Sequence, residues 1–126
     1  MVMRKVFVGL GWLFVAAVAV QFFLAGLGVL GGEGIEAHRQ WGFTALHLLP
    51  VLMLIAAIAG RMGRTVIGLT IALFVLVFLQ PLFAAADLDP PWLRSLHVLN
   101  ALIIAMVGFY LAQRGTRLIR TAPTAA

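Results

Sequence analysis

The sequence predicts an all-α integral membrane protein, a four-helix bundle. The chain has 126 residues, of which 63% are hydrophobic and 10% are charged, and its mean hydropathy is +1.11. This composition is far too apolar for a soluble domain of the same size. Four apolar stretches are long enough to cross a hydrocarbon layer of about 30 Å, which takes about 20 helical residues. We therefore expect a single transmembrane domain over residues 1–126, with its helices running up, down, up and down.

The four expected helices cover residues 6–30, 40–59, 65–86 and 92–112. The first stretch superficially resembles a signal peptide, but it is much longer than a signal core of about 7–15 residues, so we expect a retained helix. Glycine clusters within residues 31–34 and 60–63 mark the first two breaks. Pro50 lies inside the second helix and cannot bond the carbonyl of Leu46, which predicts a kink there.

Basic residues concentrate on one predicted side of the membrane. Seven of the nine lie near the termini or in the link after the second helix: Arg4, Lys5, Arg61, Arg64, Arg114, Arg117 and Arg120. The opposite side holds the other two, Arg39 and Arg94, together with all four acids, Glu33, Glu36, Asp87 and Asp89. Because short cytoplasmic segments carry the excess of Lys and Arg, both termini are expected in the cytoplasm. The net charge of +5 then reflects topology, and no nucleic acid is expected as a partner.

Histidine is the candidate metal ligand in this sequence. The chain has no cysteine, which excludes disulfides, thiolate metal sites, iron–sulfur clusters and covalent c-type haem attachment. No nucleophile–base–acid constellation or phosphate loop points to hydrolysis or phosphoryl transfer. The polar residues of the spans gather toward the predicted outer half: Gln21, His38, Thr44, His47, Gln80, His97 and Asn100. Unpaired polar groups are costly inside a membrane, so this cluster predicts a site facing the bundle interior.

A spacing of 59 residues relates the two halves of the chain. His97 follows His38 by 59 positions, and Gln80 follows Gln21 by the same 59. The same offset aligns three pairs of small residues: Gly9 with Gly68, Ala25 with Ala84, and Gly42 with Ala101. We interpret residues 6–60 and 65–119 as parallel repeats related by a pseudo-two-fold axis along the membrane normal. A coincidental match between two hairpins of similar length is the alternative.

His38 and His97 are the predicted pair of metal ligands. One helical turn after each comes a small residue, Gly42 or Ala101. A small residue there leaves room for a flat, bulky group, and a haem held between two imidazoles fits that space. Arginines beside the histidines are placed to meet the haem propionates. The residues predicted around the haem, besides these four, are Arg39, Arg94, Gln21, Gln80, His47 and Asn100.

His47 is expected to differ from the other two histidines. It follows His38 by nine positions, which places it about 180° around the helix, so the two cannot ligate one metal from one face. At the 59-residue offset it aligns with Met106 and so has no symmetry partner. We interpret it as a core histidine hydrogen-bonded to one of three polar residues: Gln21, Gln80 or Asn100. A His47–His97 ligand pair, closer to the middle of the membrane, is the alternative.

Three runs carry a resemblance to known proteins: "QFFLAGLGV" from Gln21, "HRQWG" from His38 and "LHVLNALI" from Leu96. With Gln80, they resemble a family of small four-helix bacterial membrane proteins of uncharacterised function, over nearly the whole chain. The resemblance implies a multi-pass protein of the bacterial inner (cytoplasmic) membrane. More loosely, histidines on the second and fourth helices resemble those of four-helix b-type cytochromes. Those proteins often carry further histidines for a second haem, and this sequence has no such pair near its cytoplasmic side.

The expected function is electron transfer by a membrane b-type cytochrome-like protein with one haem b near the outer face. An enzyme with its own substrate is a weaker reading. The expected partners are the lipid bilayer and, on the outer side, a quinone or another redox partner; a homo-oligomer stays open. One alternative is a cofactor-free accessory or scaffold subunit whose polar residues fix helix packing. Another is a small transporter, although the inner half offers no polar route.

Overall fold

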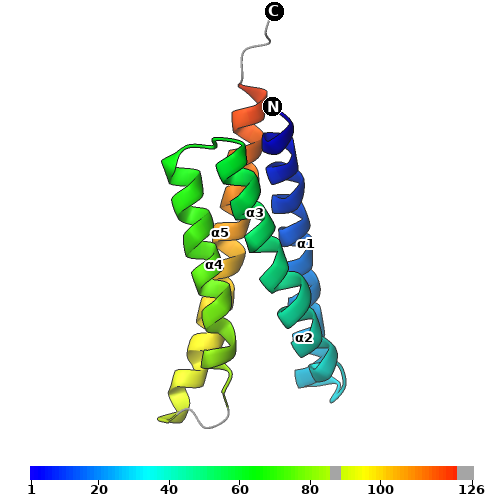
Figure 1. Ribbon diagram of the computed structural model, residues 1–126. Helices are drawn as coiled ribbons and strands as arrows, with labels where there is room; N and C mark the ends of the chain where they lie inside the picture. The colour runs from blue at the N-terminus through cyan, green and yellow to red at the C-terminus, as the bar shows by residue number, and fades with distance from the viewer. Residues whose placement is uncertain (86–88, 122–126) are drawn as a thin grey trace, which may run out of the picture.

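Helices make up almost all of the protein that the computed structural model describes, residues 1–85 and 89–121 (Figure 1). The first span is α1 (Val2–Leu30), and the second joins α2 (Ile35–Trp41), the π-helical turn η1 (Gly42–Leu46) and α3 (His47–Ala59). The third is α4 (Arg64–Phe83), and the fourth joins a short 3₁₀ helix, η2 (Pro91–Arg94), to α5 (Ser95–Arg120). Within the described residues, these four spans are long and apolar enough to cross a membrane. The chain is a multi-pass, all-α membrane protein whose four candidate spans pack as a bundle.

The observed spans are longer than the predicted ones at several ends. α1 begins at Val2, the second span begins at Ile35, and α5 continues to Arg120. Polar and charged residues ended the hydropathy signal there, but Arg, Lys, Gln and Glu are good helix formers, so the helix continues. The third span ends earlier, at Phe83. Residue 86, its predicted end, and Asp87 lie outside the described residues.

Successive spans run in opposite directions, so the start of α1, the end of α5 and the α3–α4 link lie at one end of the bundle (Figure 1). We call this the terminal end, and the opposite end, with the α1–α2 turn, the far end. α1 packs against α3 and α5, and α4 packs against the same two helices. The second and fourth spans therefore lie diagonally across the bundle from each other.

Large apolar side chains fill the part of the bundle nearer the terminal end. Five of them are completely buried: Phe7, Phe14, Met53, Leu73 and Leu111. Small residues bring α1 and α5 close together, since a Cβ on Gly11 would lie 3.2 Å from Ala112. At the terminal end itself, Arg4 Nε donates a hydrogen bond of 2.9 Å to the Gly60 carbonyl. This end of the bundle is therefore tightly packed and tied to the α3–α4 link.

Glycine permits the sharp turn between α1 and α2. Gly34, just before α2, has φ +92°, a left-handed conformation that favours glycine. A Cβ at this position would also lie only 2.9 Å from the side chain of Leu27. The second span therefore turns back directly against the end of α1, which places α2 beside it.

The π-helical turn η1 interrupts the second span just before Pro50. Proline has no N–H with which to bond the carbonyl of Leu46, so the regular hydrogen-bond ladder is already broken at this point. A π turn inserts an extra residue and shifts the faces of the residues that follow it. The irregularity lies between His38 and His47. It therefore changes the angle around the helix axis between these two side chains from the angle in a regular α-helix.

Candidate functional site

His38 and His97 face each other although they belong to diagonal spans. Their ring centroids lie 6.3 Å apart, and the ring planes meet at 60°. His38 is on α2 and His97 is near the start of α5, and both side chains are half-buried. The structure therefore brings together the two histidines that the 59-residue spacing relates.

Each of these histidines is fixed by a backbone carbonyl of its own hairpin. His38 Nδ1 lies 3.2 Å from the carbonyl oxygen of Gln21, and His97 Nδ1 lies 3.1 Å from that of Gln80. A carbonyl oxygen can only accept a hydrogen bond, so Nδ1 must carry the hydrogen in both rings. The lone pair of a neutral ring is then on Nε2, the atom left for a ligand.

A second pair of hydrogen bonds shows the same spacing. Trp41 Nε1 donates to the Ala17 carbonyl at 3.0 Å, and Asn100 Nδ2 donates to the Leu76 carbonyl at 2.8 Å. Donor and acceptor are each shifted by 59 positions between the two bonds. Sequence reasoning missed the role of Trp41, because tryptophan and asparagine share little chemistry beyond an N–H donor. Its alignment with Asn100 at the 59-residue offset was the available signal.

The two glutamine side chains, in contrast, are used differently. Gln80 Oε1 accepts a hydrogen bond of 2.6 Å from Asn100, and Gln80 Nε2 donates to the carbonyl of His97 at 3.2 Å. Gln21 Nε2 lies 3.3 Å from His38 Nε2 and donates to its lone pair. Gln21 Oε1 is buried and has no hydrogen-bond partner among the described residues. The histidine pair is therefore asymmetric, since an amide occupies Nε2 of His38 only.

Two cavities meet at the histidine pair, and five residues line both of them: Gln21, His38, Gly42, Gln80 and His97. The first cavity, of about 430 Å³, continues along residues of α1 and α5 such as Ala25 and Val98. The second, of about 570 Å³, continues along Ile35 on α2 and Pro81 on α4. Both volumes lie in the range of about 300–1,000 Å³ that is usual for ligand pockets. The histidines thus stand between cavities on two sides of the bundle.

The small residues after the histidines do not both leave open space. Ala101 lines the first cavity, as expected for a residue that makes room beside His97. Gly42 lines both cavities, but a Cβ there would lie 2.9 Å from Gln21 Nε2. The space above Gly42 is therefore filled by the Gln21 side chain, which sequence spacing did not predict.

His47 does not bond to Gln21, Gln80 or Asn100, so that prediction was wrong. Its Nδ1 donates a hydrogen bond of 2.7 Å to the carbonyl of Gly42, within the same span and across the π-helical turn. The ring stacks on Phe43, with centroids 5.4 Å apart, and meets Phe78 edge-on at 4.7 Å. His47 nevertheless lines the first cavity, beyond the His38–His97 pair.

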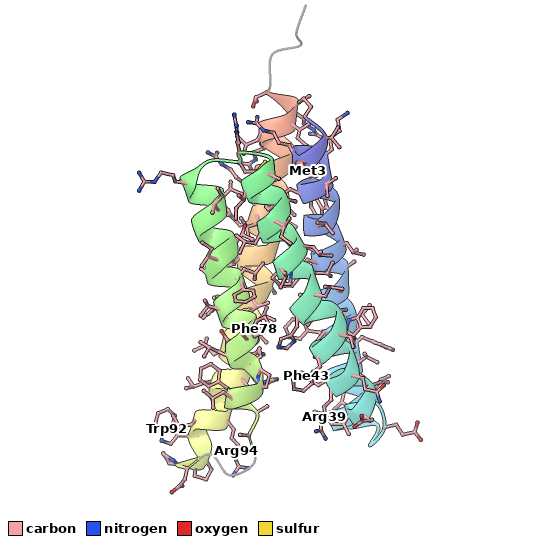
Figure 2. All side chains as sticks on the ribbon, in the orientation of Figure 1. Met3, Arg39, Phe43, Phe78, Trp92 and Arg94 are labelled. Carbon is pink, nitrogen blue, oxygen red and sulfur yellow. The ribbon has the colours of Figure 1, made fainter. Side chains whose placement is uncertain are left out.

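The two predicted arginines lie at the same end of the bundle, on different hairpins (Figure 2). Both are exposed, Arg39 lines the second cavity, and its guanidinium lies 3.9 Å from the carboxylate of Glu36. Thr44, which sequence analysis placed in the polar cluster, donates to the carbonyl of Gln40 in its own span at 2.7 Å. Thr44 therefore serves its own helix, Arg39 lies beside the second cavity, and Arg94 lines neither cavity.

The donor set at this site is two imidazoles. In the described part of the chain, no group of three or more His, Cys, Asp or Glu side chains is arranged to hold a metal ion. Two nitrogen ligands suit a metal that already has most of its coordination shell, such as a haem iron with four porphyrin nitrogens.

Comparisons with known proteins give a family but no activity. No curated protein and no solved structure matches the chain. The sequence model of a family of unknown function, DUF6220, matches residues 21–86, which are 66 of the 126 residues. The matched segment contains Gln21, His38, His47 and Gln80, and it ends before His97. The chain belongs to the DUF6220 family, a family of unknown function.

Proposed function

We propose that the protein is a membrane b-type cytochrome-like protein that holds one haem between His38 and His97. The observation that carries this proposal is the 6.3 Å separation of the two ring centroids. Metal–imidazole bonds of about 2 Å, with each nitrogen about 1 Å from its ring centre, give centroids about 6 Å apart. The two rings are therefore already at the separation that a shared iron requires.

The hydrogen bonds of the two histidines support the same role. Metal-ligating histidines almost always donate their second N–H to a carbonyl or carboxylate, which fixes the ring and its tautomer. His38 and His97 both do so, through the carbonyls of Gln21 and Gln80. To free Nε2 of His38 for the iron, the Gln21 amide has to give up its 3.3 Å contact.

The residues around His38 and His97 suit a flat group that lies between the two helical hairpins. The second cavity, of about 570 Å³, extends from the pair past Arg39 and would take this group, while the first continues between α1 and α5. Arg39 and Arg94, exposed at the same end, are placed to meet the propionates (Figure 2). Ala101 keeps the space beside His97 open.

We also interpret residues 6–60 and 65–119 as a duplication that made this pair. The bond from each histidine to a carbonyl recurs at an offset of 59 residues, and so does the bond of Trp41 or Asn100 to a carbonyl of the preceding helix, which supports this interpretation. A parallel repeat has a pseudo-two-fold axis along the membrane normal. In this arrangement the site lies on the axis, and each repeat supplies one ligand.

A haem at this position would supply one-electron redox chemistry near one face of the membrane. With seven of the nine basic residues at or near the terminal end, that end is assigned to the cytoplasm and the histidines to the outer half of a bacterial inner membrane. The part nearer the terminal end is filled by apolar side chains such as Phe7 and Leu111. The electron partners proposed are therefore a quinone in the bilayer or a redox partner on the outer side.

A cofactor-free accessory subunit is the second candidate. It is favoured by the fact that the same hydrogen bonds fasten α1 to α2 and α4 to α5. A small transporter has less support, because the residues buried nearer the terminal end, Thr70 apart, are apolar in the described structure. In the accessory reading, the histidines contribute to packing and bind nothing.

An oxidised-minus-reduced absorption spectrum of the purified wild-type protein separates the two candidates. The protein should be produced with ample haem and purified in mild detergent. The cytochrome proposal predicts sharp reduced α and Soret bands and one haem per chain. A correctly folded, fully helical protein with no visible absorption would contradict it and leave the accessory role.

A further inference from the structure

The first cavity is open to a lipid-soluble molecule. It has a volume of about 430 Å³ and runs between α1 and α5, within the candidate membrane spans. Its lining is mostly apolar and includes Val18, Phe22, Val29 and Ile104. Small residues on both helices, Ala25, Gly26 and Ala101, line it and leave space beside the histidines. A single saturated chain would fill this volume poorly, whereas a ring with an apolar tail would fill it better.

The polar groups of this cavity that lack a partner are hydrogen-bond acceptors. In the haem-free protein, Gln21 Nε2 must face His38 Nε2, because the His38 tautomer leaves only a lone pair there, so the contact fixes the amide orientation. Its Oε1 is then the buried atom without a donor. His47 donates through Nδ1 to Gly42, so its Nε2 also carries a lone pair, and no hydrogen bond from the described residues reaches it. An occupant with O–H groups satisfies these atoms, and one with only acceptors leaves them unpaired.

We propose that this cavity binds the reduced, hydroxyl-bearing form of a lipid-soluble quinone in preference to its oxidised form. The hydroquinone hydroxyls donate to His47 Nε2 and Gln21 Oε1, and the tail lies in the apolar part between α1 and α5. The choice of a redox-active ring rests on the proposed haem function, since His38 and His97 line both this cavity and the second one, in which the haem is proposed to lie. The preference for a donor rests only on the two acceptors. Because Phe43, Phe78 and Gly42 hold the His47 ring, its acceptor does not depend on haem.

Binding of a decyl-tailed benzohydroquinone and of the matching benzoquinone tests this inference. The full chain in lipid nanodiscs is titrated with each under anaerobic conditions, with empty nanodiscs as the blank. Two additional hydrogen bonds, each changing the affinity about fivefold to tenfold, make the hydroquinone bind about 25- to 100-fold more tightly than the quinone. His47→Leu removes one acceptor and is expected to weaken hydroquinone binding about tenfold while changing quinone binding little.

A matched pair of alanine variants tests the location. Ala25 lines the first cavity only, and Ala84, its counterpart at the 59-residue offset, lines the second only. Ala25→Leu fills the first cavity and should abolish binding of both forms, whereas Ala84→Leu should leave both unchanged. This pair decides the question even if His47→Leu proves too unstable to purify.

The outcomes separate this inference from the haem proposal. Equal affinity for the two redox forms, or equal effects of Ala25→Leu and Ala84→Leu, would overturn the hydroquinone site while leaving haem binding untouched. Dodecanol bound as tightly as the hydroquinone would refute the choice of occupant. A preference for the hydroquinone in a protein that takes up no haem would support the site and contradict the haem proposal.

Discussion

Gly108 on α5 packs directly against the ring of Phe14 on α1, so that a Cβ on the glycine would lie 2.7 Å from ring carbons. Phe14 is completely buried and cannot swing into solvent or lipid. This contact sets how closely the first and last spans approach, and it lies in the packed part of the bundle that supports the histidine site. Adding one methyl group at Gly108 tests how much this contact contributes to stability.

Gly108→Ala is therefore expected to destabilise the bundle by about 1–3 kcal/mol, the usual cost of overpacking a core. Gly9→Ala is the matched control, because nothing lies within 4 Å of a Cβ at that position. The control should be neutral or slightly stabilising, since alanine is the better helix former by about 0.5–1 kcal/mol. Thermal unfolding in detergent, followed by circular dichroism, measures both. Equal midpoints for the two variants would show that the contact does not limit packing.

Asn100 should contribute more to stability than a polar residue that bonds only its own helix. Asn100→Leu removes the side-chain donor that bonds both the Leu76 carbonyl and Gln80 Oε1. We expect a loss of about 1–2 kcal/mol, because hydrogen bonds between membrane helices contribute about 1 kcal/mol each or slightly less. Thr44→Ala is the control, since its hydroxyl bonds to Gln40 in the same span. Denaturant unfolding in detergent that gives both variants the same stability would contradict this ranking.

Much of the fold follows from simple features of the sequence. Long apolar stretches separated by glycine clusters such as that around Gly34 locate all four spans, although the last one extends eight residues further than predicted. The 59-residue spacing singles out His38 and His97 because polar residues are rare in membrane spans and are not placed at random. The structure brings these two histidines together.

The finer contacts of the site could not be predicted from side-chain identity. Ala17 and Leu76 take part through their carbonyl oxygens, which every residue has, so their sequence carries no sign of the role. The π-helical turn gives His47 a partner in Gly42, and a regular helix would not present that carbonyl. The Gln21 amide fills the space above Gly42, because side chains of neighbouring helices occupy whatever volume a small residue leaves.

The membrane orientation predicts where a terminal reporter can be detected. The start of α1 and the end of α5 lie at the end of the bundle that is rich in basic residues, so both termini should be cytoplasmic. A fluorescent protein at the C-terminus should be fluorescent, and alkaline phosphatase at the same position should be inactive. The reverse pattern would place the histidine site on the cytoplasmic side and contradict the proposed outer site.

The central claim, that His38 and His97 together coordinate one haem, is tested most directly by the haem content of three matched variants. His38→Ala, His97→Ala and His47→Ala are purified after co-expression with ample haem, and haem per chain is measured together with the low-spin absorption bands. Removing either member of the pair leaves the iron without a second imidazole, so both variants should lose the low-spin spectrum. His47, fixed by Gly42 and lying outside the pair, should be replaceable with full haem content. If His47→Ala loses the haem and His38→Ala retains it, the ligands are His47 and His97, and the claim is wrong.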